Sequence, residues 1–155
     1  MEQKTKIEAK PGHQEILITR DFELPVHLLF KAYEEAELVE AWMGTKVLKL
    51  ESKRHGGYQY ETTDPMGNKH LFSGVIHEFL QDERIVRTFE MEDKQLGIQL
   101  EFLAFEALSA DRSRLVMHVV YQSVAIRDQI LKLPFAQGIN MAHNRIEDLL
   151  KQQNN

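Results

Sequence analysis

Residues 56–89 read GGYQYETTDPMGNKHLFSGVIHEFLQDERIVRTF. The runs Tyr58–Thr63, Lys69–Leu80 and Arg84–Glu90 are alternating or largely apolar, which is typical of β-strands. Asp64–Gly67 separates the first two runs with a turn in which proline fixes one dihedral angle and glycine accepts a positive one. Because short turns join neighbouring strands that run in opposite directions, the stretch predicts an antiparallel meander.

The chain before the meander supplies two more strands with two helices between them. Glu15–Leu24 alternates apolar and polar residues, which predicts a strand with one buried face. Arg20 interrupts its apolar face, and two interpretations are open: a cation paired with a nearby carboxylate, or a guanidinium at the mouth of a cavity. Pro25 suits the first turn of a short helix, and a second short helix ends at Gly44 as a left-handed cap. Val47–Glu51 is the next predicted strand.

Two strands and two helices are predicted after the meander. The strand at Leu96–Leu108 carries apolar residues in alternation, so its apolar row is predicted to face inward, with Gln99 and Glu101 outward. That predicted inward row is Ile98, Leu100, Phe102 and Ala104. Another strand ends near Tyr121, and Ser123 is a good cap for a short helix. Pro134 then opens a helix to about residue 152, with an apolar stripe on one face and Arg145, Glu147, Asp148 and Lys151 on the solvent face.

Length and composition limit the class of protein. A chain of 155 residues is expected to form one domain, which we place at residues 14–152, between a flexible segment at 1–13 and a frayed end at 153–155. The net charge of -5 argues against a nucleic-acid partner, which needs a clustered basic surface. No apolar run is long enough to insert into a membrane. The chain has no cysteine, which excludes disulfides and favours a cytoplasmic location.

This order of elements, together with several short motifs, resembles the START-like superfamily, also called SRPBCC or birch-pollen-allergen-like. Within it, the sequence is most similar to the family that resembles the activator of the ninety-kilodalton heat-shock chaperone ATPase. The motifs are Ile18–Pro25, Trp42 with Gly44, Gly56–Tyr58, Gly67, Phe72–Gly74, Glu83–Phe89, Arg127–Asp128 and Gly138. The resemblance implies an α+β helix-grip fold. In that fold a curved antiparallel sheet of six to seven strands surrounds the long C-terminal helix, and two short helices follow the first strand.

A sheet curled around one helix leaves space between the two, so we expect a cavity there. Its predicted lining is aromatic and apolar, with two phenol hydroxyls, which suits a flat or lipid-like ligand. The candidate ligand-binding residues are Trp42, Tyr58, Tyr60, Phe72, Ile76, Phe102, Leu115, Met117, Phe135, Ile139 and Met141. The alternative interpretation is that these side chains form an ordinary core with no open space.

The sequence offers little evidence of catalysis or of metal binding. None of its seven histidines has a second histidine at a ligand spacing, and no cofactor motif is present, so we expect neither metal nor cofactor. If one face of the strand at Lys69–Leu80 lines the cavity, His70 and Glu78, with Arg87 and Tyr60, would be placed for acid–base chemistry. If that face meets solvent, they are ordinary surface groups.

Three functions follow from these observations. The leading hypothesis is a protein that binds a small hydrophobic or aromatic molecule in the cavity, with no catalysis assigned. The family resemblance suggests an interaction module that assists a chaperone, with an exposed contact patch and a filled pocket. The third is a small cyclase or hydrolase that acts on a hydrophobic substrate inside the cavity.

Overall fold

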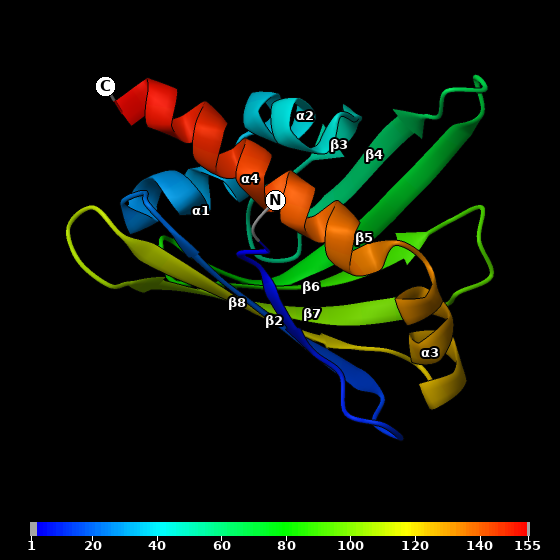
Figure 1. Cartoon of the computed structure of the whole chain (residues 1–155). Coiled ribbons are helices and arrows are strands. Elements are labelled where there is room, and N and C mark those ends of the chain that lie inside the picture. Colours follow the sequence, from blue (N-terminus) through cyan, green and yellow to red (C-terminus); the bar gives the residue numbers. More distant parts are fainter. Residues whose placement is uncertain (1–2, 155) are drawn as a thin grey trace.

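Eight antiparallel strands form one curved sheet, and a long C-terminal helix lies across its inner face (Figure 1). This is the predicted α+β helix-grip architecture. The computed structural model describes residues 3–154. Met1 and Glu2, from the segment expected to be flexible, and Asn155, from the end expected to fray, lie outside the described residues.

The strands follow a simple order in space, β1-β2-β8-β7-β6-β5-β4-β3, and each pairs with its neighbours in antiparallel register. Strands β3 to β8 therefore form a continuous meander, which confirms the arrangement predicted from residues 56–89. The bounds are β1 Lys6–Glu8, β2 Glu15–Phe22, β3 Lys46–Leu50, β4 Gly57–Thr63, β5 Lys69–Leu80, β6 Arg84–Met91, β7 Ile98–Ala107 and β8 Ser113–Val120.

Within residues 3–154, four helices connect to this sheet. Helices α1 (Val26–Glu34) and α2 (Ala36–Met43) lie between β2 and β3, while α3 (Val124–Lys132) and α4 (Phe135–Asn154) follow β8. Local signals set their ends as predicted: Gly44 has a φ of 64° after α2, and the Ser123 hydroxyl accepts a bond of 3.1 Å from the Ile126 N–H at the start of α3. Among the residues that the structure describes, no helix is long and apolar enough to cross a membrane.

The sheet has one strand more than the six to seven that the sequence predicts. Strand β1 pairs with β2, with Ile7 opposite Ile18, inside the segment 1–13 for which flexibility is expected. The strand is only three residues long, so alternation cannot reveal it in the sequence. Its position comes from β2, whose outer edge would otherwise be unpaired. The predicted first strand is therefore β2, and the two short helices follow it.

The inward face of β7 is the opposite of the predicted one. Glu101, Leu103 and Phe105 are buried, at 4%, 0% and 5% exposure, whereas Phe102 is only half-buried and its ring stacks on His118 with 5.7 Å between centroids. The prediction was wrong because both faces of β7 carry apolar residues and Glu101 was assumed to need solvent. The pairing of Glu101 with a cation from β6 allows its burial instead.

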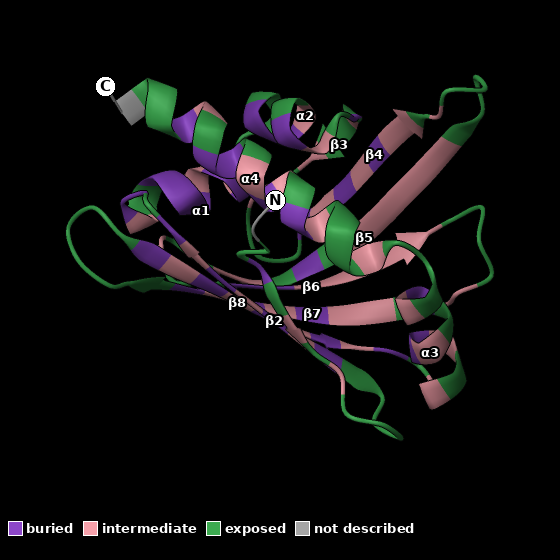
Figure 2. Cartoon of the chain, viewed as in Figure 1, coloured by how far each residue is buried: buried purple, intermediate pink, exposed green. Residues whose placement is uncertain are grey.

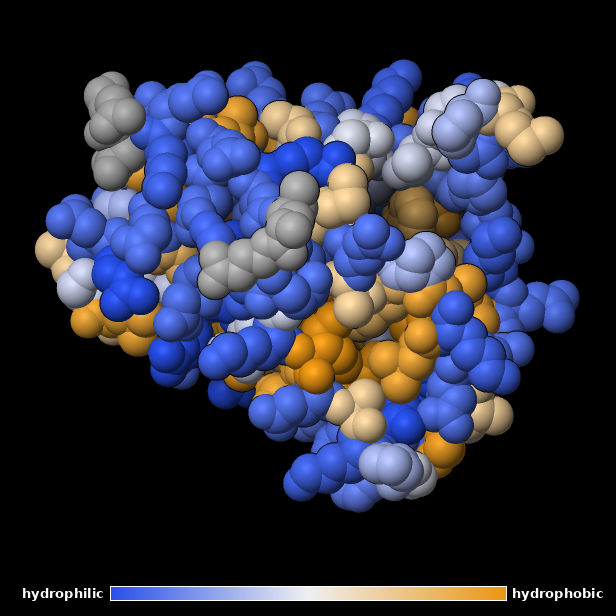
Figure 3. Space-filling model, in the orientation of Figure 1, coloured by the Kyte–Doolittle hydropathy of each residue, from blue (hydrophilic) through white to orange (hydrophobic). Residues whose placement is uncertain are grey.

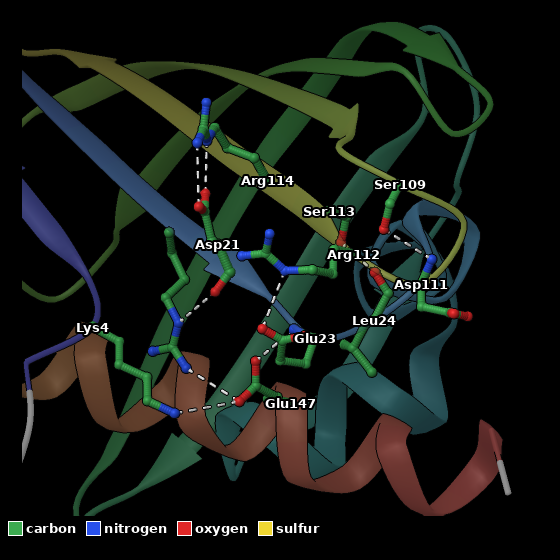
Figure 4. A network of polar contacts seen from close by, with 11 residues as sticks. Lys4, Asp21, Glu23, Leu24, Ser109, Asp111, Arg112, Ser113, Arg114 and Glu147 are labelled. Atoms are coloured by element: carbon green, nitrogen blue, oxygen red, sulfur yellow. Dashed lines mark hydrogen bonds and ion pairs between the residues drawn. The ribbon is translucent and has the colours of Figure 1, made fainter.

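Polar contacts hold the C-terminal half of α4 against β2 (Figure 4). The Glu147 carboxylate accepts a bond of 2.9 Å from the Glu23 N–H, and it lies 3.8 Å from the Arg20 guanidinium and 3.7 Å from the Lys4 ammonium. Glu147 is buried, which corrects its predicted place on the solvent face. Of the two interpretations of Arg20, the structure supports the cation paired with a carboxylate.

The two halves of α4 differ in burial (Figure 2). Ile146 and Leu150, in the second half, are fully buried at 0% exposure, whereas no residue of the first turn, 135–139, is buried. Side-chain packing of the second half thus fixes the helix on the sheet. In the first half, only Asn140 and His143 are buried, and both contact Thr5 of the N-terminal segment.

Candidate functional site

A cavity of about 500 Å³ lies between the first half of α4, helix α2 and the inner face of the sheet. Most of its lining is aromatic or aliphatic, and α4 supplies one wall through residues one turn apart. The lining residues are Tyr33, Trp42, Met43, Phe72, Arg87, Met117, Pro134, Phe135, Gly138, Ile139, Ala142, His143 and Arg145. Its volume falls within the range of about 300–1,000 Å³ that is usual for small-molecule sites.

A second cavity of about 440 Å³ adjoins the first. The two share Phe72, Pro134 and Phe135, and the second extends between β6 and the end of α3, where Ile130 and Leu133 lie. Hydrophobic side chains gather at the surface around the start of α4 and beside α3 (Figure 3). The two cavities therefore form one apolar region under the first turns of α4.

A buried ion pair lies on the sheet side of the first cavity. The Arg87 Nε–H on β6 donates to Glu101 Oε1 on β7 at 2.8 Å, and the two residues are opposite each other in the antiparallel register. The other oxygen of Glu101 accepts a bond of 2.7 Å from the Gln99 amide. Only 11% of the Arg87 side chain and 6% of the Glu101 side chain are exposed, so this pair is largely removed from water.

Tyrosine rings surround the Arg87 guanidinium. Its central carbon lies 5.2 Å from the Tyr58 ring centroid and 5.8 Å from that of Tyr33, which is within cation–π range. Burial raises the pKa of Tyr33, Tyr58 and Tyr60 above the ordinary value, because the phenolate would lose its hydration. The three hydroxyls therefore stay protonated at neutral pH.

One glycine allows Tyr58 to reach across the sheet. The Tyr58 hydroxyl on β4 donates to the Thr88 carbonyl on β6, and its ring passes over Gly74 on the strand between them. A Cβ at Gly74 would lie 2.0 Å from that carbonyl oxygen and 2.6 Å from the Tyr58 hydroxyl. Gly74 is therefore required by this close approach.

His143 on α4 lines the cavity beside the N-terminal segment. Its Nδ1 shares a hydrogen bond of 2.9 Å with the Thr5 hydroxyl, and its ring meets the edge of Phe22 at 5.5 Å between centroids. Burial, assisted by the nearby Arg20 charge, lowers the pKa of His143 to about 3. The imidazole is therefore neutral at physiological pH.

The structure separates the predicted ligand-binding residues into three groups. Five line the first cavity: Trp42, Phe72, Met117, Phe135 and Ile139. Four others are buried in the core without lining it: Tyr58, Tyr60, Ile76 and Leu115. Two lie elsewhere, since Phe102 is on the outer face of β7 and Met141 is 49% exposed on α4. The binding role of the first group stays a prediction.

The charged residues of the cavity are not predicted by the sequence alone. Arg145 was assigned to the solvent face but lies at the rim, and His143 was given no role. Arg87 was considered only for catalysis, although its place in the same row as Ile85 and Phe89 indicated burial. Its partner Glu101 was assigned outward, so the ion pair could not be recognised.

The residues suggested for acid–base chemistry do not meet. His70 lies between Asp64 and Asp93, 2.9 Å from the Asp64 carboxylate, beyond the edge of the cavity. Glu78 pairs with Arg84 at 3.2 Å, because an irregularity in the pairing of β5 after Ile76 shifts its direction. Among residues 3–154, no cluster of histidine and carboxylate side chains is arranged to hold a metal ion.

Comparison with known proteins agrees with the fold. This chain is similar to a solved structure from Rhodobacter sphaeroides, with 20% identity and a TM-score of 0.84 over 95% of this chain and 99% of that one. It is also similar to a structure from Mycobacterium smegmatis, with 20% identity and a TM-score of 0.83 over 94% of this chain and 96% of that one. A solution structure from Staphylococcus epidermidis is similar too, with 21% identity and a TM-score of 0.80 over 96% of this chain and 94% of that one. At these identities the likeness shows the fold alone.

A search of curated proteins gives no match. The family model described as "Activator of Hsp90 ATPase homolog 1-like protein" matches residues 23–151, which is most of the domain. The matched region runs from the end of β2 to the last turns of α4, so it includes both cavities and the Arg87–Glu101 pair. The chain therefore belongs to this family, a branch of the START-like superfamily.

Proposed function

We propose that this protein binds a small hydrophobic or aromatic molecule in the space between α4 and the sheet. The observation that carries the proposal is the first cavity, about 500 Å³ in volume, with aromatic and aliphatic walls. An apolar hollow of this size exposes hydrophobic side chains to water, and a bound apolar molecule would cover them. The absence of cysteine supports a reducing compartment, the cytoplasm, as the place where binding occurs.

Catalysis has less support than binding. A reaction in the cavity would need a titratable group with a pKa suited to proton transfer near neutral pH. Of the groups that line the cavity, the phenol of Tyr33 has a raised pKa, and His143 has a pKa lowered to about 3. These groups donate or accept hydrogen bonds at pH 7 but do not exchange protons, which suits recognition of a ligand.

The family description supports a second proposal, an interaction with a heat-shock chaperone that stimulates its ATPase. An interaction module of this kind is expected to have a filled pocket. The open cavity therefore favours ligand binding. Measuring the ATPase rate of the chaperone with and without this protein tests the second proposal, and an unchanged rate would contradict it.

Blocking the cavity tests the proposed function. Ala142 lines the cavity from α4, so Ala142→Phe adds a ring to open space, and we expect it to weaken binding of apolar probes about tenfold while the fold is kept. Binding is measured by NMR titration with a panel of lipids and planar polyphenols. Shift changes are expected at Phe72, Trp42 and Ile139.

The matched control is Ala136→Phe, the same change on the exposed face of the same helix. It should leave affinity unchanged. If no probe in the panel shifts resonances around the cavity, or if Ala142→Phe binds like the wild type, the proposal fails.

A further inference from the structure

The charged groups of the first cavity are all of one sign. Arg87 and Arg145 line it, and none of the described residues in its lining is an aspartate or a glutamate. This is unexpected in a chain whose net charge is -5. His143 adds no charge, because burial keeps its imidazole neutral at physiological pH. The charged side chains that line the cavity are thus two guanidinium groups, in a protein whose net charge is negative.

Arg87 presents its charge to the cavity from the sheet. Its side chain lines the space, whereas its counter-ion Glu101 does not. A guanidinium has five N–H donors, and Glu101 takes the one on Nε. The remaining donors exceed what the neighbouring Tyr60 hydroxyl can accept. Arg87 therefore has hydrogen bonds to offer a ligand in a largely dry environment, where such bonds are strongest.

Arg145 supplies a second guanidinium at the rim. It is exposed on α4, two turns after Gly138, and both residues line the cavity. Among residues 3–154 the structure gives the Arg145 side chain no ion pair and no hydrogen-bond partner. Since Arg87 is neutralised by Glu101, Arg145 leaves one uncompensated positive charge at the cavity. A single carboxylate would neutralise this charge, whereas a phosphate monoester would bring more negative charge than the one positive charge can balance.

The rest of the site is apolar. Beyond Phe72 and Phe135 the second cavity offers about 440 Å³ lined by residues such as Phe89, Ile130 and Leu133. We propose that the ligand is an amphipathic carboxylate, with its acid group between Arg87 and Arg145 and its apolar body under the first turns of α4. This inference rests on the proposed binding function and specifies the chemical class of the ligand.

Matched probes that differ only in the head group test the inference. Octanoate and 1-octanol share one chain, as do 4-phenylbutanoate and 4-phenylbutan-1-ol, so both aliphatic and aromatic bodies are covered. We expect each acid to bind at least about tenfold more tightly than its alcohol at pH 7 and low salt, by calorimetric or NMR titration. Salt should weaken binding of the acids only.

Variants of the rim residue identify the group responsible. Arg145→Gln should weaken octanoate binding about threefold and leave 1-octanol unaffected, while Arg145→Lys should retain most of the preference. Arg54→Gln is the matched control, since Arg54 is exposed in the turn before β4, outside the cavity lining. Both positions are exposed, so the three variants are expected to fold.

These experiments distinguish a failure of the carboxylate inference from a failure of the proposed binding function. Equal affinity for acid and alcohol would overturn the carboxylate inference and leave the binding function standing. A preference for acids that Arg54→Gln reduces as much as Arg145→Gln would also overturn it, because the effect would come from net charge. If neither head group binds, the proposed function fails and the inference with it.

Discussion

Replacing Glu101 with leucine is expected to lower the free energy of unfolding by about 3–5 kcal/mol, the usual loss when one partner of a buried ion pair is removed. The reason is the low exposure of both side chains, 11% for Arg87 and 6% for Glu101. Without the carboxylate, the Arg87 charge stays away from water with only aromatic faces and hydroxyls around it. Such a loss is a large part of the stability of a typical domain, about 5–15 kcal/mol.

The double variant Arg87→Met with Glu101→Leu removes both charges and should recover most of that loss, because apolar side chains of similar volume can replace a buried pair. Urea unfolding at pH 7 of the two single variants and the double variant gives the coupling energy. The pair Asp21–Arg114, also cross-strand but 39% exposed on each side, is the matched control. Asp21→Leu should lower the free energy of unfolding by less than about 1 kcal/mol. A similarly small cost for Glu101→Leu would mean that water solvates Arg87.

Acidification should destabilise the protein through His143. Its pKa is about 3 in the folded state against an ordinary value of 6.5, so between these values the unfolded chain binds more protons and stability falls as pH falls. At pH 5 the free energy of unfolding is expected to be about 2 kcal/mol lower than at pH 7 because of this one group. Denaturant unfolding at several pH values, with NMR of the imidazole to verify that it stays neutral at pH 5, measures the effect.

The variant His143→Asn keeps a hydrogen-bonding group near Thr5 and should flatten the dependence of stability on pH over this window. His70 affects the pH dependence of stability in the opposite direction, because the carboxylates of Asp64 and Asp93 accept hydrogen bonds from its imidazole and raise its pKa. Its stabilisation is present below pH 6.5 and is lost as pH rises through the folded pKa, so His70→Asn should steepen the loss on acidification. If His143→Asn leaves the slope unchanged, His143 is hydrated in the folded protein.

Local signals in the sequence were sufficient for the architecture. Gly44 adopts the positive φ of 64° that its place after α2 requires, and Gly67 in the turn between β4 and β5 has a φ of 87°. The apolar stripe of α4 and the alternation in β2 each indicate one buried face. These features act over a few residues, so their effect on the backbone does not depend on distant parts of the chain.

The site was less predictable, and β7 shows the reason. Alternation with period two indicates that one face of a strand is buried but does not say which, when Leu100 and Phe102 compete with Leu103 and Phe105. The choice was made by pairing with β6, which places Glu101 beside Arg87. The same applies to Glu147, which is buried because Arg20 and the Glu23 N–H, more than a hundred residues earlier, lie against it.

By itself, the sequence determined the elements from β2 onward, their order and the presence of a sheet that grips a terminal helix. The tertiary structure alone decided which charges are buried, that Phe102 and Met141 lie outside the cavity, and that Arg87 and Arg145 line it. The physical reason is that the preference of a residue for helix or strand depends on its neighbours in sequence, whereas the burial of a charge depends on a partner of opposite charge. That partner reaches it only when strands and helices distant in sequence come together.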